Sequence, residues 1–226
     1  MNTTATITKI TDEAQGIKSF HLKLKEPMMF KAGQYIMIAF KDDLERKKAF
    51  SVIHTNKEND EVKLGIKVEH EFTQRLFNTK EGTTLEASGP YGRFNLPEKD
   101  RNIVFIAGGI GITPILSMLT AYSSDKKRKS NVTIYFSSRT KEMMPFFNEI
   151  EMIKDPRITK RYIFTNEHVK GYMHDQLRVD KIKTQVQDWK EAIYMICGPP
   201  LMMTSIRSQL QNEGIPDEDI RSESFV

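Results

Sequence analysis

One glycine-rich stretch has the residue types and the spacing of a phosphate-binding turn. The stretch AGGIGITP, Ala107 to Pro114, follows an apolar run and leads into ILSMLTAY, so it lies at a strand-to-helix turn. Its glycines would let backbone N–H groups approach an anion, and the following helix would present its positive end. The last glycine of the G-x-G-x-x-G fingerprint is missing, and Pro114 stands in its place. From this spacing alone, a phosphate cradle and a tight turn without ligand are equally good interpretations.

The end of this stretch predicts how the following helix starts. Thr113 is a residue type that caps helix N-termini, and Pro114 suits the first helical position because its missing N–H would be unpaired there. We therefore expect the helix to begin at Pro114, with Gly108, Gly109 and Gly111 free to contact a pyrophosphate.

Two further stretches carry groups that could act on a ligand. Cys197-Gly-Pro-Pro200 follows the apolar run Ala192–Ile196, at the predicted carboxyl end of a strand. A lone cysteine is more often a small buried apolar residue, and no neighbouring pattern indicates an activated nucleophile. Lys48-Ala-Phe-Ser51 brings a cation, an aromatic ring and a hydroxyl together. These groups could bind a phosphate and a planar ring, although taken alone the combination is common.

The first half of the chain must position the Lys48–Ser51 stretch with short strands. About six strands separated by turns predict a small antiparallel barrel or sandwich. One helical segment, Phe72–Asn78, interrupts them. The expected strands are Ala5–Ile10, Ile17–Leu24, Gln34–Phe40, Phe50–His54, Val62–Val68 and Thr83–Ala87.

After Asp100 the pattern changes to alternating strands and helices. This alternation predicts a doubly wound α/β domain with a parallel sheet and ligands at the carboxyl ends of its strands. We place the boundary in Pro97–Asp100, which gives domains of residues 1–98 and 99–226. The expected elements are strands at Ile103–Ala107, Val132–Phe136, Tyr162–Phe164 and Ile193–Cys197, with helices at Pro114–Tyr122, Met144–Ile153 and Leu201–Glu213.

The composition excludes several functions. The 226 residues carry a net charge of +4, which suits an acidic protein partner but is too small to indicate nucleic-acid binding. We interpret the run Lys126–Lys129 as a solvated loop. The single cysteine excludes intrachain disulfides and an iron–sulfur cluster, which needs about four thiolates. We identify no metal site. No signal peptide and no apolar span of roughly 20 residues is visible, so we expect a cytoplasmic protein without membrane insertion.

Taken in order, the motifs point to one family. The motifs, in chain order, are Lys48-Ala-Phe-Ser51, Gly89-Pro-Tyr-Gly92, Gly108–Pro114, Cys197-Gly-Pro-Pro200 and Glu223-Ser-Phe225. In this order the chain resembles the ferredoxin–NADP reductase superfamily over essentially its whole length. The resemblance implies a flavin-binding antiparallel barrel at 1–98 and an NAD(P)H-binding α/β domain at 99–226, with FAD and NADPH or NADH as cofactors.

The resemblance also assigns residues to the flavin. Ser51 should lie near the reactive nitrogen of the flavin. Lys48 takes the place of the family's usual arginine, and a lysine keeps the positive charge at the phosphate but lacks the bidentate fork of arginine. His70-Glu-Phe-Thr73-Gln-Arg-Leu76 is similar to the family's G-x-x-S-x-x-L, where Thr73 would cap the helix and donate to phosphate. The flavin-contacting residues implied are Lys48, Ala49, Phe50, Ser51, Lys67, Val68, Phe72, Thr73 and Phe225.

On the nucleotide side, Ser138 and Arg139 sit where the adenosine ribose is read, and they could take a 2′-phosphate. This favours NADPH, but arginine also occurs there in NADH-using relatives, so the donor stays open, and a solvated turn without ligand is an equally good interpretation. The residues implied for NAD(P)H are Gly109, Gly111, Thr113, Pro114, Ser138, Arg139, Cys197, Gly198, Pro199 and Met202. The implied catalytic residues are Ser51, Cys197, which should face the nicotinamide, and Glu223, which could relay protons beside the shielding ring of Phe225.

The implied activity is hydride transfer from NAD(P)H to bound FAD, followed by electron transfer to a separate acceptor such as a ferredoxin or an oxygenase component. The basic excess favours an acidic ferredoxin. The alternatives are a reductase of free flavin and a nucleotide-binding module without catalysis.

Overall fold

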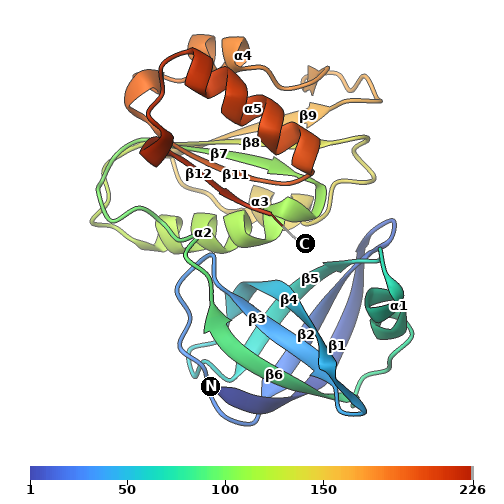
Figure 1. Cartoon of the computed structure of the whole chain (residues 1–226). Helices are drawn as coiled ribbons and strands as arrows, with labels where there is room; N and C mark the ends of the chain where they lie inside the picture. Colours follow the sequence, from blue (N-terminus) through green and yellow to red (C-terminus); the bar gives the residue numbers. More distant parts are fainter. Residues whose placement is uncertain (225–226) are drawn as a thin grey trace.

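A computed structural model describes residues 1–224 of the chain. The chain forms two lobes, a β-barrel below and an α/β domain above it in Figure 1. The barrel ends with Tyr91 and the first strand of the α/β domain begins at Ile103. Residues 92–102 connect the two, and this segment contains the predicted boundary.

The lower lobe is the predicted antiparallel barrel. Its strands close in the order β1-β2-β5-β4-β3-β6. Alternating apolar side chains fill the interior, such as Ile36, Ile38 and Phe40 on β3, because successive residues of a strand point to opposite faces. The barrel elements are β1 (Asn2–Ala14), β2 (Ile17–Leu24), β3 (Tyr35–Phe40), β4 (Asp43–Thr55), β5 (Glu61–Lys67), α1 (Glu71–Phe77) and β6 (Thr84–Tyr91).

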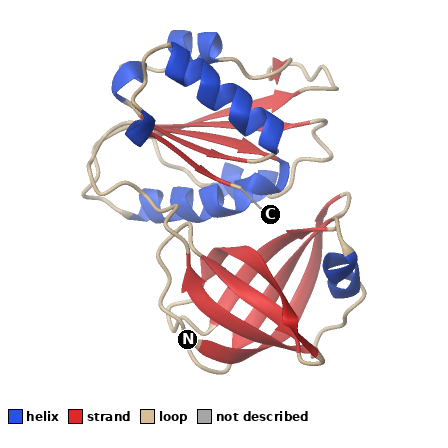
Figure 2. Cartoon of the chain, in the orientation of Figure 1, coloured by secondary structure: helices blue, strands red, loops and turns tan. Residues whose placement is uncertain are grey.

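The upper lobe is the predicted doubly wound domain, with parallel strands in the order β10-β9-β8-β7-β11-β12. Helices α2 and α3 cover the face nearer the barrel, and α4 and α5 cover the other (Figures 1 and 2). With both faces covered, β7 and β11 are continuous buried runs. The elements are β7 (Ile103–Gly108), α2 (Ile112–Ser124), β8 (Val132–Ser138), α3 (Phe147–Met152), β9 (Ile158–Phe164), β10 (Met173–His174), α4 (Val179–Gln185), β11 (Ile193–Cys197), α5 (Pro200–Asn212) and β12 (Ile220–Glu223).

The strand order reverses between β7 and β11. The chain runs from β7 outward through β8, β9 and β10, and then crosses back to place β11 on the free side of β7. In open α/β sheets, ligands bind outside the carboxyl ends of the strands at such a reversal. The glycine stretch after β7 and the Cys197-Gly-Pro-Pro stretch after β11 both lie there.

Several elements differ from the sequence-based expectation. Strand β4 begins at Asp43 rather than Phe50, because its polar first half pairs with β3 across a tight hairpin. Strand β12 pairs with β11 along its whole length, and neither it nor α4 and β10 was predicted. The basic run 126–129 is only partly solvated: Arg128 donates to the carbonyl oxygen of Pro97 at 2.5 Å and covers the ring of Tyr122.

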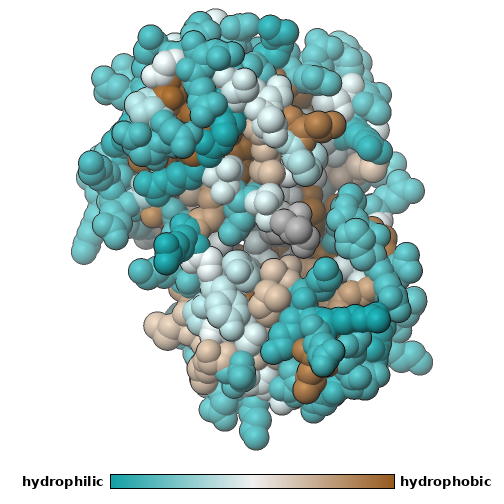
Figure 3. Space-filling model, viewed as in Figure 1, coloured by the Kyte–Doolittle hydropathy of each residue, from teal (hydrophilic) through white to brown (hydrophobic). Residues whose placement is uncertain are grey.

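Within residues 1–224, no helix combines the length and the apolar character needed to cross a bilayer. Most of the surface in Figure 3 is hydrophilic, whereas weakly polar and apolar residues gather where the two lobes meet.

Candidate functional site

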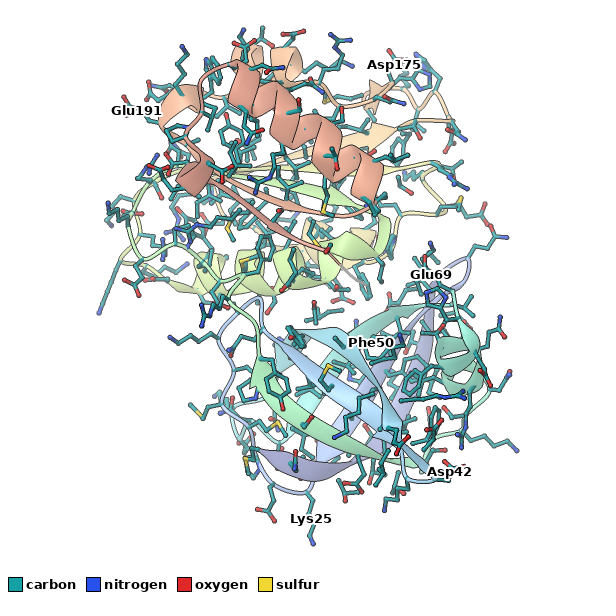
Figure 4. All side chains as sticks on the ribbon, viewed as in Figure 1. Lys25, Asp42, Phe50, Glu69, Asp175 and Glu191 are labelled. Atoms are coloured by element: carbon teal, nitrogen blue, oxygen red, sulfur yellow. The ribbon has the colours of Figure 1, made fainter. Side chains whose placement is uncertain are left out.

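Two adjoining cavities lie at the junction of the lobes. The first, which we call the barrel pocket, has a volume of about 100 Å³ and is lined mainly by β4, β5 and α1. The second, the sheet-edge cleft, has a volume of about 550 Å³ and follows the carboxyl ends of β7, β8 and β11. Lys67, Glu69 and Ile110 line both cavities, so the two are continuous. Figure 4 shows Phe50 and Glu69 on the side of the barrel nearest the α/β domain.

Most residues predicted to contact the flavin line the barrel pocket. They are Lys48, Ala49, Phe50, Ser51, Lys67, Phe72 and Thr73. Val68 does not line it; its backbone N–H donates to the carbonyl oxygen of Gly16 at 2.9 Å. Phe225 lies outside the described residues.

Ser51 presents an unpaired hydroxyl in this pocket. Its side chain is only 2% exposed, and its Oγ is buried without a hydrogen-bond partner among residues 1–224. Leaving a buried polar group unpaired costs about 1–3 kcal/mol, so the pocket is suited to a ligand with a complementary polar edge. Beside it, the rings of Phe50 and Phe72 stack with centroids 6.2 Å apart and planes 26° apart, forming a flat apolar wall.

Lys48 supplies positive charge to the same pocket. It is half-buried on β4, and no carboxylate of the described chain pairs with its ammonium group, whereas nearby Arg46 pairs with Glu71 at 3.1 Å. The charge of Lys48 is therefore available for an anionic group of a ligand.

Thr73 is used differently from the prediction. The N-cap of α1 is His70, and Thr73 is the third helical residue. Its Oγ1 accepts the backbone N–H groups of Glu69 and His70, both at 3.0 Å, and donates to the carbonyl oxygen of His70 at 2.9 Å. The hydroxyl thus satisfies the start of the helix from its third residue, and its contact with a phosphate stays a prediction.

The helix after the glycine stretch starts earlier than expected. A 3₁₀ turn, η1 (Gly109–Gly111), follows β7 directly and α2 begins at Ile112. Thr113 is therefore not the N-cap, and its Oγ1 donates to the carbonyl oxygen of Ile110 at 3.0 Å. Pro114 is the third helical residue rather than the first, which is tolerated because first-turn N–H groups have no partner within the helix.

Glycine is required where the two turns meet. A Cβ on Gly111 would lie 2.3 Å from the carbonyl oxygen of Cys197, and one on Gly198 would lie 2.9 Å from the backbone nitrogen of Gly108. Gly109 has a φ of +52°, a left-handed conformation that glycine adopts readily. The turns after β7 and β11 are thus in backbone contact, and this arrangement suits the close approach of a pyrophosphate.

The sheet-edge cleft collects most of the residues predicted for NAD(P)H. Gly109, Gly111, Ser138, Arg139, Gly198, Pro199 and Met202 line it. Thr113 instead lines the barrel pocket, from the α/β side. Pro114 and Cys197 are buried and, in the described part of the chain, line neither cavity.

Cys197 and Glu223 are paired neighbours on β11 and β12. Burial, with a smaller effect of the Glu223 charge, raises the pKa of the Cys197 thiol well above its usual range. The thiol therefore stays protonated at neutral pH and is not a nucleophile. Burial also raises the pKa of Glu223 to about 7, and its Oε2 is buried without a partner among the described residues. Glu223 can therefore hold or release a proton near neutral pH.

Comparison with known proteins matches each lobe to a separate domain. Residues 4–96 match the oxidoreductase FAD-binding domain, and residues 105–208 match the oxidoreductase NAD-binding domain. The chain belongs to the ferredoxin–NADP reductase-like superfamily. The predicted family and fold are confirmed, and so is the predicted pair of FAD-binding and NAD-binding domains.

Individual relatives of this reductase-like chain are longer than the chain itself. The phenol hydroxylase P5 protein of Acinetobacter pittii is 31% identical over 98% of this chain and 65% of its own length. The reductase component of phenol 2-monooxygenase from a Pseudomonas species is 26% identical over 97% of this chain and 64% of its own length. Flavohemoglobin from Malassezia yamatoensis, solved with bound FAD and heme, superposes with a TM-score of 0.88 at 25% identity, over 100% of this chain and 60% of that one.

Some residues that line the two cavities of this reductase-like chain were not predicted from the sequence. Gly65 and Ile110 line the barrel pocket, and Gln15 of the β1–β2 turn reaches the sheet-edge cleft from the FAD-binding domain. A glycine inside a predicted strand often marks close approach of another group, so Gly65 carried a usable signal. Gln15 carried none, because its position depends on how the two domains pack.

Proposed function

We propose that this chain is an NAD(P)H-dependent flavin oxidoreductase that transfers a hydride from NAD(P)H to bound FAD. The observation that carries the proposal is the continuity of the two cavities. The barrel pocket holds the orphaned Ser51 hydroxyl, the sheet-edge cleft holds the paired glycine turns, and Lys67, Glu69 and Ile110 line both. Such an arrangement would bring the two cofactors together.

Bound FAD would supply the hydride acceptor, and the protein would supply orientation. In the barrel pocket, Lys48 would hold a phosphate, Phe50 would pack along the flavin ring, and Ser51 would donate its unpaired hydroxyl to the polar edge of that ring. In the cleft, the backbone N–H groups around Gly109 and Gly111 would hold the pyrophosphate of NAD(P)H. Fixing both reactants in this way supplies proximity and removes water from the reacting atoms.

Two residues at the sheet edge, the buried Cys197 and the half-buried Glu223, would support this placement. Cys197 packs its protonated thiol into the core while its carbonyl oxygen contacts Gly111, so it would act by shaping the nicotinamide end of the cleft. Glu223, whose pKa is raised to about 7, would exchange a proton at its unpaired Oε2. The pair Ser138 and Arg139, at the end of β8, would read the ribose and favour NADPH if a 2′-phosphate is bound.

The electrons would leave to an acceptor that these 226 residues do not contain. A relative named as the reductase component of phenol 2-monooxygenase supports a redox protein as the acceptor, and a ferredoxin or an oxygenase component is our proposal. The modest positive charge supports an acidic partner.

The test begins with the visible spectrum of the purified protein and an anaerobic titration with NADH and, separately, with NADPH. A yellow protein that bleaches with one of them supports the proposal and identifies the donor. A colourless protein that reduces added flavin would replace the proposal with a free-flavin reductase. A colourless protein that binds nucleotide and reduces nothing would refute catalysis and leave a binding module.

A further inference from the structure

Lys63 on β5 joins the two domains through a partly buried cluster of charges. Its ammonium group pairs with Glu149 on α3 of the NAD-binding domain, and with Glu13 on β1 of its own barrel at 3.2 Å. The side chains are 12% exposed for Lys63, 14% for Glu13 and 31% for Glu149. The Lys63–Glu149 contact therefore joins the two domains, and as a partly buried pair it is screened less than a surface pair.

On the same strand, the backbone of Gly65 lies very close to side chains of the NAD-binding domain. Gly65 follows two residues after Lys63, on the same face of β5. A Cβ on Gly65 would lie 2.7 Å from the ring of Phe146 and 2.7 Å from the methyl group of Thr113. Phe146 is 3% exposed and has a φ of +58°, a conformation that non-glycine residues rarely adopt. The Lys63 ammonium lies 5.0 Å from the centre of this ring.

This contact lies at the wall of the barrel pocket. Gly65 and Thr113 both line the pocket, one from each domain. Ser51 lines the same pocket from β4, whose Val52 pairs with Leu64, the residue before Gly65. A shift of the NAD-binding domain along β5 would therefore move its residues relative to Ser51 and change the distance between the two cofactor sites.

We propose that Lys63 and Glu149 are positioning residues for hydride transfer. Their ion pair holds the NAD-binding domain on β5 at the Phe146–Gly65 contact, and this fixes the separation of nicotinamide and flavin. Neither side chain lines either cavity, so the pair acts through the placement of the domains and not through contact with a cofactor. The inference rests on the proposed function.

The test compares Glu149→Gln with the matched control Glu13→Gln. Both variants remove one carboxylate from the same ammonium group with little change of shape, but only Glu149 crosses the domain interface. In anaerobic stopped-flow reduction, Glu149→Gln should lower the limiting rate about 10- to 100-fold, the effect expected of reactants displaced by up to 1 Å. The half-saturating concentration of NAD(P)H should stay the same. Glu13→Gln should stay within about twofold of the unmodified protein on both measures.

A second measurement does not depend on catalysis. Hydrogen–deuterium exchange of the full chain, without added nucleotide, should be faster in residues 61–67 and 144–152 of Glu149→Gln than in those of Glu13→Gln. Equal slowing in both variants, no slowing in either, or a rise in half-saturating nucleotide that matches the rate loss would overturn the positioning role. If the unmodified protein oxidises no NAD(P)H while the exchange difference is present, the proposed function fails but the domain restraint stands. If exchange is the same in both variants, the restraint itself is refuted.

Discussion

Replacing Gly111 with alanine tests whether the glycine turn is the nucleotide cradle. The new Cβ would lie 2.3 Å from the carbonyl oxygen of Cys197 and 2.6 Å from the backbone nitrogen of Gly198. Gly111 has a φ of −60°, so the change adds no left-handed strain and acts only by collision. Ordinary contacts at the new atom would require the turn after β7 to move away from the turn after β11 by about 1 Å. Overpacking of this kind costs about 1–3 kcal/mol of stability.

The same displacement should weaken nucleotide binding. If half of the upper value, about 1.5 kcal/mol, falls on the bound geometry, the affinity for NAD(P)H falls about tenfold, because 1.4 kcal/mol corresponds to a factor of ten. We would measure the dissociation constant by calorimetry, stability by urea unfolding, and FAD content by absorbance, which should not change. Gly82→Ala is the control: its φ is +88° with no atom within 4 Å of the new Cβ, so it should lose stability but keep affinity. An affinity of Gly111→Ala within about twofold of the unmodified protein would refute the cradle.

Substitutions at three further positions test groups at the candidate site. Ser51→Ala removes an unpaired buried hydroxyl, so the FAD-free protein should unfold at the same or a higher urea concentration. Flavin reduction by the FAD-bound variant should slow about tenfold. Unchanged single-turnover reduction kinetics would exclude the role of Ser51. The Lys48→Arg variant should retain FAD at least as well as the unmodified protein, whereas Lys48→Ala should release FAD on dilution. Filtration and absorbance measure the FAD retained. Equal retention by Lys48→Ala and the unmodified protein would exclude Lys48 from the phosphate site. Burial raises the pKa of Glu223 to about 7 from 4.5, so the native state binds this proton more tightly than the unfolded chain. Its contribution to stability is complete below pH 4.5 and is lost as the pH rises through about 7. Glu223→Gln should remove this pH dependence of the free energy of unfolding. At pH 8 its free energy of unfolding should exceed that of the unmodified protein by about 1–2 kcal/mol, after allowance for partial exposure. Parallel profiles of unfolding free energy against pH would argue against a raised pKa of Glu223.

The sequence predicted elements whose apolar pattern is local, and it missed boundaries that distant contacts decide. Alternation over Ile17–Leu24 and the apolar run Ile193–Cys197 match β2 and β11 along their full length. The start of α2 was predicted two residues late because capping preferences are local. The real start follows from the left-handed φ of Gly109 and from contact with a strand far along the chain.

The candidate site divides in the same way. Residues named from short motifs, such as Lys48–Ser51 and Ser138–Arg139, line the cavities, although their roles stay predictions. The side chain of Cys197, expected to face the nicotinamide, is buried, and its carbonyl oxygen lies against Gly111; its place at the nicotinamide stays a prediction. The Lys63–Glu149 pair could not be predicted, because its two residues belong to different domains and meet only where those domains pack. The apolar pattern that predicts each domain does not depend on the other domain.

Burial of the only cysteine makes the protein suited to spectroscopic labelling. Thiol reagents attack the thiolate, and Cys197 is fully buried with a raised pKa, so it should stay inert in the folded state. Cysteines introduced at the exposed positions Lys25 and Glu191, which lie on different domains, would then be the only reactive thiols. A pair of spin labels or fluorophores at these two sites would report the distance between the domains without replacement of the native cysteine.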